Sequence, residues 1–202
     1  MESKGQMFLI GAVVIASALL ILKVATRTPT SINELKNLKG GFEGDMFTNI
    51  VAEFNKTMDL SVYEGIGVTS NVYDFGNFTK DNMIEHSLDL KLVFVGLVAN
   101  RTTGFMNISV VNLYGSSISA TLTLNDSQSN TSSVADYGRW DTNFTFTAGK
   151  DYILTVTYDS TRNNMTIETK TNKDVYVGYF DISLESPSSI HRTKYQKSMI
   201  MK

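Results

Sequence analysis

The sequence predicts a mainly β protein with an N-terminal hydrophobic α-helix, short amphipathic helices and then an antiparallel β-sandwich head. Three observations lead to this fold class. An uncharged apolar run fills residues 7–22, apolar residues then recur at three- and four-residue spacings, and from residue 88 short apolar stretches alternate with turn residues. We expect five parts: a short N-terminal segment at 1–5, a hydrophobic helix at 6–25, a stalk with amphipathic helices at 26–87, the β-sandwich at 88–185 and a basic C-terminal tail at 186–202.

Composition narrows the classes of function. The chain has 202 residues, a formal net charge of -2 and no cysteine. The length suits one domain with accessory segments. The charge disfavours nucleic acid as a partner, because proteins that neutralise phosphates present a basic surface. The lack of cysteine removes disulfides, thiolate catalysis and cysteine-ligated metals from consideration.

No motif for chemistry stands out. The two histidines, His86 and His191, lie far apart in the sequence, and neither a nucleophile elbow nor a phosphate-binding or dinucleotide-binding loop is present. Aspartates at 126, 136, 141 and 159 are expected in turns, where solvated side chains are a better interpretation than calcium ligands. We therefore expect no enzyme activity, no cofactor and no metal site.

The apolar run MFLIGAVVIASALLIL ends at Lys23 and is slightly shorter than the ~20 residues that a spanning helix needs, although flanking lysines can reach the interface. Three interpretations compete: a cleaved secretory signal, an uncleaved anchor, and a pilin-type segment that keeps its apolar part. Charged residues follow the run where a secretory cleavage site prefers small ones, which disfavours the first. The small residues Gly11, Ala12 and Ala16 would let neighbouring helices approach closely.

The residues Lys4-Gly5-Gln6, placed directly before this run, resemble the class III signal of archaeal type IV pilins and archaellins. The resemblance covers about the first 25 residues. It implies that a prepilin peptidase cuts between Gly5 and Gln6, and that copies of the chain assemble through the apolar helix. Ile10 occupies the fifth mature position, where bacterial-type pilins carry Glu, so the resemblance is to the archaeal branch.

Helical patterns continue after the apolar run. Pro29 predicts a break, because the residue before proline avoids helical geometry. A capping-box spacing predicts a short helix over residues 31–41, ended by Gly40-Gly41. A second amphipathic helix is expected from Asp45, and a third over residues 70–86, where Gly76 weakens the pattern.

Strand patterns fill the rest of the chain. Antiparallel pairing is expected because the connections are short. The polar segment 125–137 is expected to be a long exposed loop or a flexible edge. The basic stretch 191–202 is expected to fray, with pairing to a neighbour's sheet edge as the alternative. Seven strands are predicted, over residues 88–98, 105–113, 118–124, 143–147, 152–158, 165–170 and 175–184.

Eight N-glycosylation sequons occur, more than the content of Asn, Ser and Thr predicts by chance. If these sequons are glycosylated, the residues after Lys23 lie outside the cell. The charges flanking the apolar run do not by themselves give its orientation in the membrane. The candidate acceptors are Asn55, Asn77, Asn100, Asn107, Asn125, Asn130, Asn143 and Asn164.

The leading hypothesis is therefore a structural subunit of an extracellular archaeal type IV pilus-like filament. It would be inserted in the cytoplasmic membrane before assembly, with a glycosylated β-rich head at the cell surface, and its partners would be copies of itself, a prepilin peptidase and N-glycans. The alternative is a single-pass, membrane-anchored cell-surface protein for adhesion or envelope structure. A membrane-anchored hydrolase is a third hypothesis, because one fold hosts many chemistries.

Overall fold

The structure is a computed structural model that describes residues 32–125 and 127–201, with side chains described from residue 41. In these residues the chain is mainly β, with antiparallel sheets and two helices. The helices are α2 (Ile32–Glu64) and α3 (Val68–Ile84). The strands are β1 (Asp89–Asn100), β2 (Phe105–Leu113), β3 (Ile118–Leu124), β4 (Gln128–Val134), β5 (Gly138–Thr145), β6 (Asp151–Tyr158), β7 (Thr161–Glu168), β8 (Val175–Glu185) and β9 (Ile190–Ile200).

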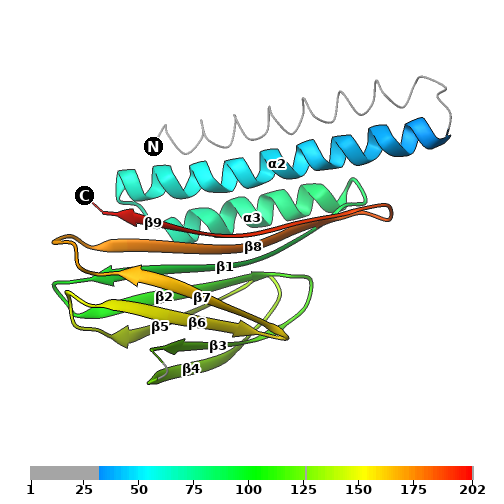
Figure 1. Cartoon of the computed structure of the whole chain (residues 1–202). Coiled ribbons are helices and arrows are strands. Elements are labelled where there is room, and N and C mark those ends of the chain that lie inside the picture. Colours follow the sequence, from blue (N-terminus) through cyan, green and yellow to red (C-terminus); the bar gives the residue numbers. More distant parts are fainter. Residues whose placement is uncertain (1–31, 126, 202) are drawn as a thin grey trace.

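The strands form two sheets. Sheet A has five strands in the order β5-β2-β1-β8-β9, and sheet B has four in the order β4-β3-β6-β7, with every neighbouring pair antiparallel. The two helices cover one face of sheet A, and sheet B lies on its other face (Figure 1). One apolar core fills the space between the sheets and a second lies between the helices and sheet A. Sheet A is therefore the middle layer, which explains why β8 is buried along nearly its whole length.

Glycines allow the helices to approach sheet A closely. Gly76 lies in the middle of α3, and a Cβ there would be 2.6 Å from Cδ1 of Leu113. Gly96 of β1 lies opposite Gly178 of β8, and a Cβ on Gly178 would be 2.5 Å from Sδ of Met58. The glycine that weakened the helical pattern in the sequence is thus the residue that lets α3 pack on the sheet.

The helical region differs from the prediction at its start. Residues 32–64 form one continuous helix, so the prediction that Gly40-Gly41 ends a short helix is wrong. Each glycine costs about 1 kcal/mol relative to Ala in a helix interior, and apolar burial further along α2, at Ile50, Phe54 and Met58, offsets that cost. The predicted helix over residues 70–86 is confirmed as α3.

Two predictions about the strands need correction. The segment expected to be an exposed loop or a flexible edge contains β4, an edge strand of sheet B, so the loop alternative is wrong. The stretch expected to fray is β9, which pairs with β8 along its full length. Periodicity missed β4 because its inward positions carry polar residues that reach β5: Asn130 Nδ2, for example, donates to Thr142 Oγ1 at 2.8 Å. The described residues contain nine strands where seven were predicted.

The N-terminal predictions lie outside the described residues. They are the leader at 1–5, the apolar helix at 6–25 with Gly11, Ala12 and Ala16, and the break at Pro29. Within residues 32–125 and 127–201, neither helix combines the length and the apolar character that crossing a bilayer requires.

Candidate functional site

A buried lysine is the centre of a polar network between α3 and sheet A. Lys80 of α3 is 2% exposed, at the interface between α3 and sheet A. Its Nζ donates to the carbonyl of Leu113 at 2.9 Å and to both carboxylate oxygens of Asp136, at 3.1 and 3.2 Å. It also lies 4.7 Å from the ring centroid of Tyr137, close enough for a cation–π contact. The ammonium group therefore contacts a carbonyl, a carboxylate and an aromatic ring.

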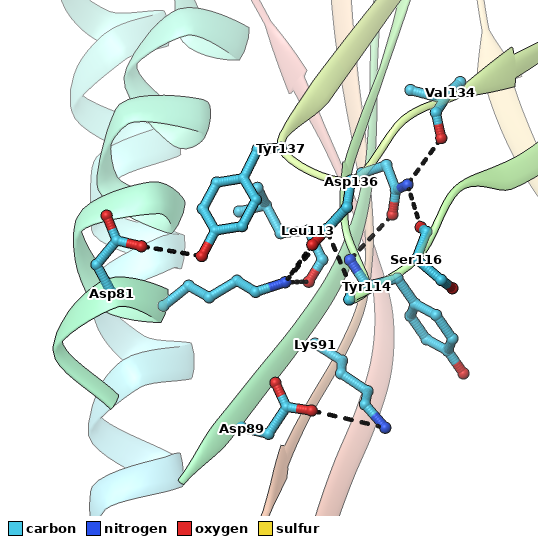
Figure 2. A network of polar contacts seen from close by, with 12 residues as sticks. Asp81, Asp89, Lys91, Leu113, Tyr114, Ser116, Val134, Asp136 and Tyr137 are labelled. Atoms are coloured by element: carbon cyan, nitrogen blue, oxygen red, sulfur yellow. Dashed lines mark hydrogen bonds and ion pairs between the residues drawn. The ribbon is translucent and has the colours of Figure 1, made fainter. Parts of the chain in front are cut away.

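The network extends into two turns (Figure 2). Asp136 also accepts a hydrogen bond from the backbone N–H of Gly115 at 2.9 Å. Tyr137 donates to Asp81 of α3 at 2.9 Å, and burial together with this hydrogen bond raises the pKa of Tyr137 to about 12. The β2–β3 turn, the β4–β5 turn and α3 are thereby joined through one lysine and one aspartate.

Asn112 fixes the same turns from the side of sheet A. The residue is fully buried, and its Nδ2 donates to the carbonyls of Ser116 at 2.8 Å and Val134 at 2.9 Å. Its Oδ1 accepts from the N–H of Tyr114 at 2.9 Å. Satisfied buried polar groups of this kind specify one arrangement of the turns, because breaking any bond leaves an unpaired group in a dry site.

The contacts of this network hold α3 and the two turns together. Lys80 is held by a carboxylate, a carbonyl and an aromatic face, so its nitrogen is not presented to a substrate. Asp136 lies in the β4–β5 turn, as expected for these aspartates, but its half-buried carboxylate is paired with the buried lysine instead of being simply solvated. Asp141 lies within β5 and binds Arg139, with Nε to Oδ1 at 2.8 Å.

A second buried acid lies on β8. Asp181 is 2% exposed and accepts hydrogen bonds from Arg192 Nε at 2.8 Å and from the hydroxyl of Tyr158, while Lys194 Nζ lies 3.3 Å from its Oδ2. Burial acts to raise the pKa of Asp181, but the bonds from Arg192 and Tyr158 outweigh it and hold that pKa below its usual value. Burial also raises the pKa of Tyr179, beside Tyr158, to about 12.

Both clusters had weak signals in the sequence. Lys80 falls four positions after Gly76 and eight after Val72, on the stripe of α3 that faces the sheet. Asp181 is the single charged residue in the mostly apolar strand YVGYFDISL. A charge inside an apolar pattern indicates a buried pair, but its partner could not be found, because Lys80 and Asp136 lie 56 positions apart.

The histidines do not form a site. His86 is exposed just beyond the end of α3, and His191 of β9 stacks on Phe47 with ring centroids 5.9 Å apart. Across residues 32–125 and 127–201, no three His, Asp or Glu side chains gather in a way that could hold a metal ion.

The sequons divide by exposure. Two of the exposed ones, Asn107 of β2 and Asn143 of β5, lie directly opposite each other in sheet A. In the half-buried group, Asn77 has a buried Oδ1 without a hydrogen-bond partner. The exposed acceptors are Asn107, Asn125, Asn143 and Asn164, and the half-buried ones are Asn55, Asn77, Asn100 and Asn130.

The processing residues Lys4, Gly5 and Gln6 lie outside the described residues. No protein-family model matches the chain, and no curated protein matches it.

Proposed function

We propose that this chain is a structural subunit of an extracellular archaeal type IV pilus-like filament, assembled through its N-terminal apolar helix. The observation that carries the proposal is Lys4-Gly5-Gln6 placed directly before the uncharged run of residues 7–22. The β-sandwich head, built from sheets A and B, would stand outside the filament core and carry the N-glycans.

The described residues support a structural role through the way their buried charges are used. Lys80 and Asp181 are each paired with opposite charges and hydrogen-bond partners inside the fold. Both clusters tie secondary-structure elements together: Lys80 joins α3 to two turns, and Asp181 joins β8 to β9 and, through Tyr158, to sheet B. This use of buried charge suits a subunit that must keep its shape in a polymer without disulfides.

N-terminal sequencing and intact mass of protein taken from cells test the processing step. A mature chain that begins at Gln6 supports the proposal, and Gly5→Leu should abolish that product while Ser3→Ala leaves it unchanged. Sheared cell-surface material should then contain filaments by electron microscopy. An intact Met1 in the surface form, with no filaments, would favour the alternative of a permanently anchored surface protein, for which the apolar run between Lys4 and Lys23 suffices.

Glycan occupancy tests the location of the head. We expect mass spectrometry of tryptic glycopeptides to find Asn107, Asn143 and Asn164 occupied more fully than Asn77, because Asn77 packs against the fold on α3 and its side-chain oxygen is buried. Asn143→Gln should remove the glycan at that position alone. Unmodified masses at all eight sequons would remove glycosylation from the proposal without affecting the processing step.

A further inference from the structure

Strand β9 is an edge of sheet A whose own backbone has an open side, whereas the backbones of two other edge strands, β5 and β7, are bound by glutamine side chains of the opposite sheet. Gln128 of β4 forms two hydrogen bonds with the backbone of Thr145 in β5, at 2.9 and 3.1 Å. Gln196 of β9 forms two with the backbone of Thr166 in β7, at 2.8 and 3.2 Å. Among the described side chains none hydrogen-bonds to the backbone of β9, which pairs only with β8. An 11-residue edge strand therefore has one side open to pairing.

The basic side chains of β9 do not protect this edge. Lysines commonly block edge strands by projecting from them, but here Arg192 and Lys194 turn to Asp181. Lys197 turns to Asp59 of α2, with Nζ and Oδ1 2.5 Å apart. Because Arg192 and Lys194 share one carboxylate and Lys197 has another, these three cations oppose an incoming strand less than the sequence suggests.

The order of residues along β9 is self-complementary about Tyr195. Ile190 and Ile200 are 69% and 56% exposed and lie five positions before and after that tyrosine. In an antiparallel pair of two β9 strands centred on Tyr195, each Ile190 would lie opposite an Ile200. The remaining cross-strand neighbours would be His191 with Met199, Arg192 with Ser198, Thr193 with Lys197 and Lys194 with Gln196. No two like charges lie directly opposite each other in this register, and the two most exposed apolar side chains of the strand meet.

We propose that β9 pairs with β9 of a second copy of this chain, antiparallel and with Tyr195 at the twofold axis. The contact is isologous, since the same strand serves both copies, and it joins the two five-stranded sheets into one continuous sheet. Main-chain hydrogen bonds supply the attachment and the isoleucine pairs fix the register. The inference goes beyond the proposed function and does not depend on removal of the leader.

Cysteine pairing tests the register directly, because the chain has no cysteine of its own. Opposed residues in antiparallel strands have Cα atoms about 4.5–5.5 Å apart, inside the range of roughly 4.4–6.8 Å that a disulfide spans. The full chain carrying Ile190→Cys is mixed in detergent with the full chain carrying Ile200→Cys and oxidised mildly. A covalent dimer is expected in the mixture and in neither variant alone, because two Ile190 positions in the pair would be roughly 34 Å apart.

A matched control uses Ile153→Cys on the exposed face of sheet B, which should not cross-link with Ile190→Cys. The proposal would be overturned if the control mixture or either single variant cross-linked as much as the mixture of Ile190→Cys and Ile200→Cys. It would also be overturned if that mixture, with both proteins folded, gave no covalent dimer. A charge variant gives a second readout: Ser198→Asp, opposite Arg192, should tighten the dimer several-fold, and Ser198→Lys should weaken it several-fold in analytical ultracentrifugation. The same dissociation constant for both variants would contradict the register even if dimers form.

Discussion

Changing Asp136 to Asn removes a negative charge from beside Lys80 while keeping the shape of the side chain. The Lys80 side chain is 3% exposed and that of Asp136 is 25% exposed, so the two partners differ in their access to water. Asp136→Asn leaves a buried ammonium group with neutral partners alone, the Leu113 carbonyl, the Tyr137 ring and the amide oxygen of the new side chain, which should cost about 2–4 kcal/mol of unfolding free energy. Lys80→Met leaves a carboxylate that keeps the Gly115 N–H and can reach water, so it should cost only about 1–2 kcal/mol.

The assay is a urea titration of the full chain followed by the fluorescence of Trp140, with the unfolding free energy obtained by linear extrapolation. The double variant Lys80→Met/Asp136→Asn should resemble Lys80→Met, because no buried charge is then left alone. Asp141→Asn is the control, since its pair with Arg139 is exposed and should be worth less than about 1 kcal/mol. The reasoning is refuted if Lys80→Met costs as much as Asp136→Asn, or if the control costs as much as either.

Two further predictions concern packing and pH. Gly76→Ala should destabilise the protein by about 1–2 kcal/mol despite the better helix propensity of Ala, because the new Cβ meets Leu113. Gly41→Ala, whose Cβ meets nothing within 4 Å, should stabilise the protein by about 0.5–1 kcal/mol. Thermal unfolding of both variants checks the signs, and two shifts of the same sign would contradict the packing argument. Burial raises the pKa of Tyr179 from 10.0 to about 12, so its hydroxyl contributes stability that is present below pH 10 and lost as the pH rises through about 12. Tyr179→Phe should lose less stability than the wild type over that interval in urea titrations, and identical losses would argue against a buried, neutral tyrosine.

Strands could be predicted from the sequence where their apolar residues face a core. The strands β1 and β8, which are buried on both faces, have long apolar patterns and were placed close to their observed bounds. β4 has only one buried apolar residue, Val134 at its end, so no alternation marked it. In β9, residues on both faces remain partly exposed, so the strand has no apolar alternation. Its pairing with β8 is a tertiary contact that the local sequence pattern does not reveal.

The polar clusters were predictable only in part. That Lys80 and Asp181 interrupt apolar patterns is visible in the sequence, and a buried pair is the physical consequence. The partners were not predictable, because the fold brings Asp136 to Lys80 from a turn in a segment that was expected to be a loop or a flexible edge. For Arg192 the expectation of a frayed terminus concealed the pairing with Asp181, although only 11 positions separate the two residues.

The order of strands in sheet A has a consequence for how the chain reaches its final state. β1 is the centre of the sheet, and its neighbour β8 is separated from it by all the strands of sheet B. Sheet B consists of neighbours in sequence or nearly so and can assemble early, whereas β1 must wait for a partner made much later. When the chain is synthesised or exported from its N-terminus, one backbone edge of the long apolar strand β1 therefore stays unpaired until residues 175–185 have been made or exported. Loss of the last 28 residues would thus remove a central strand, and aggregation of the unfinished sheet is the hazard that folding of this chain has to avoid.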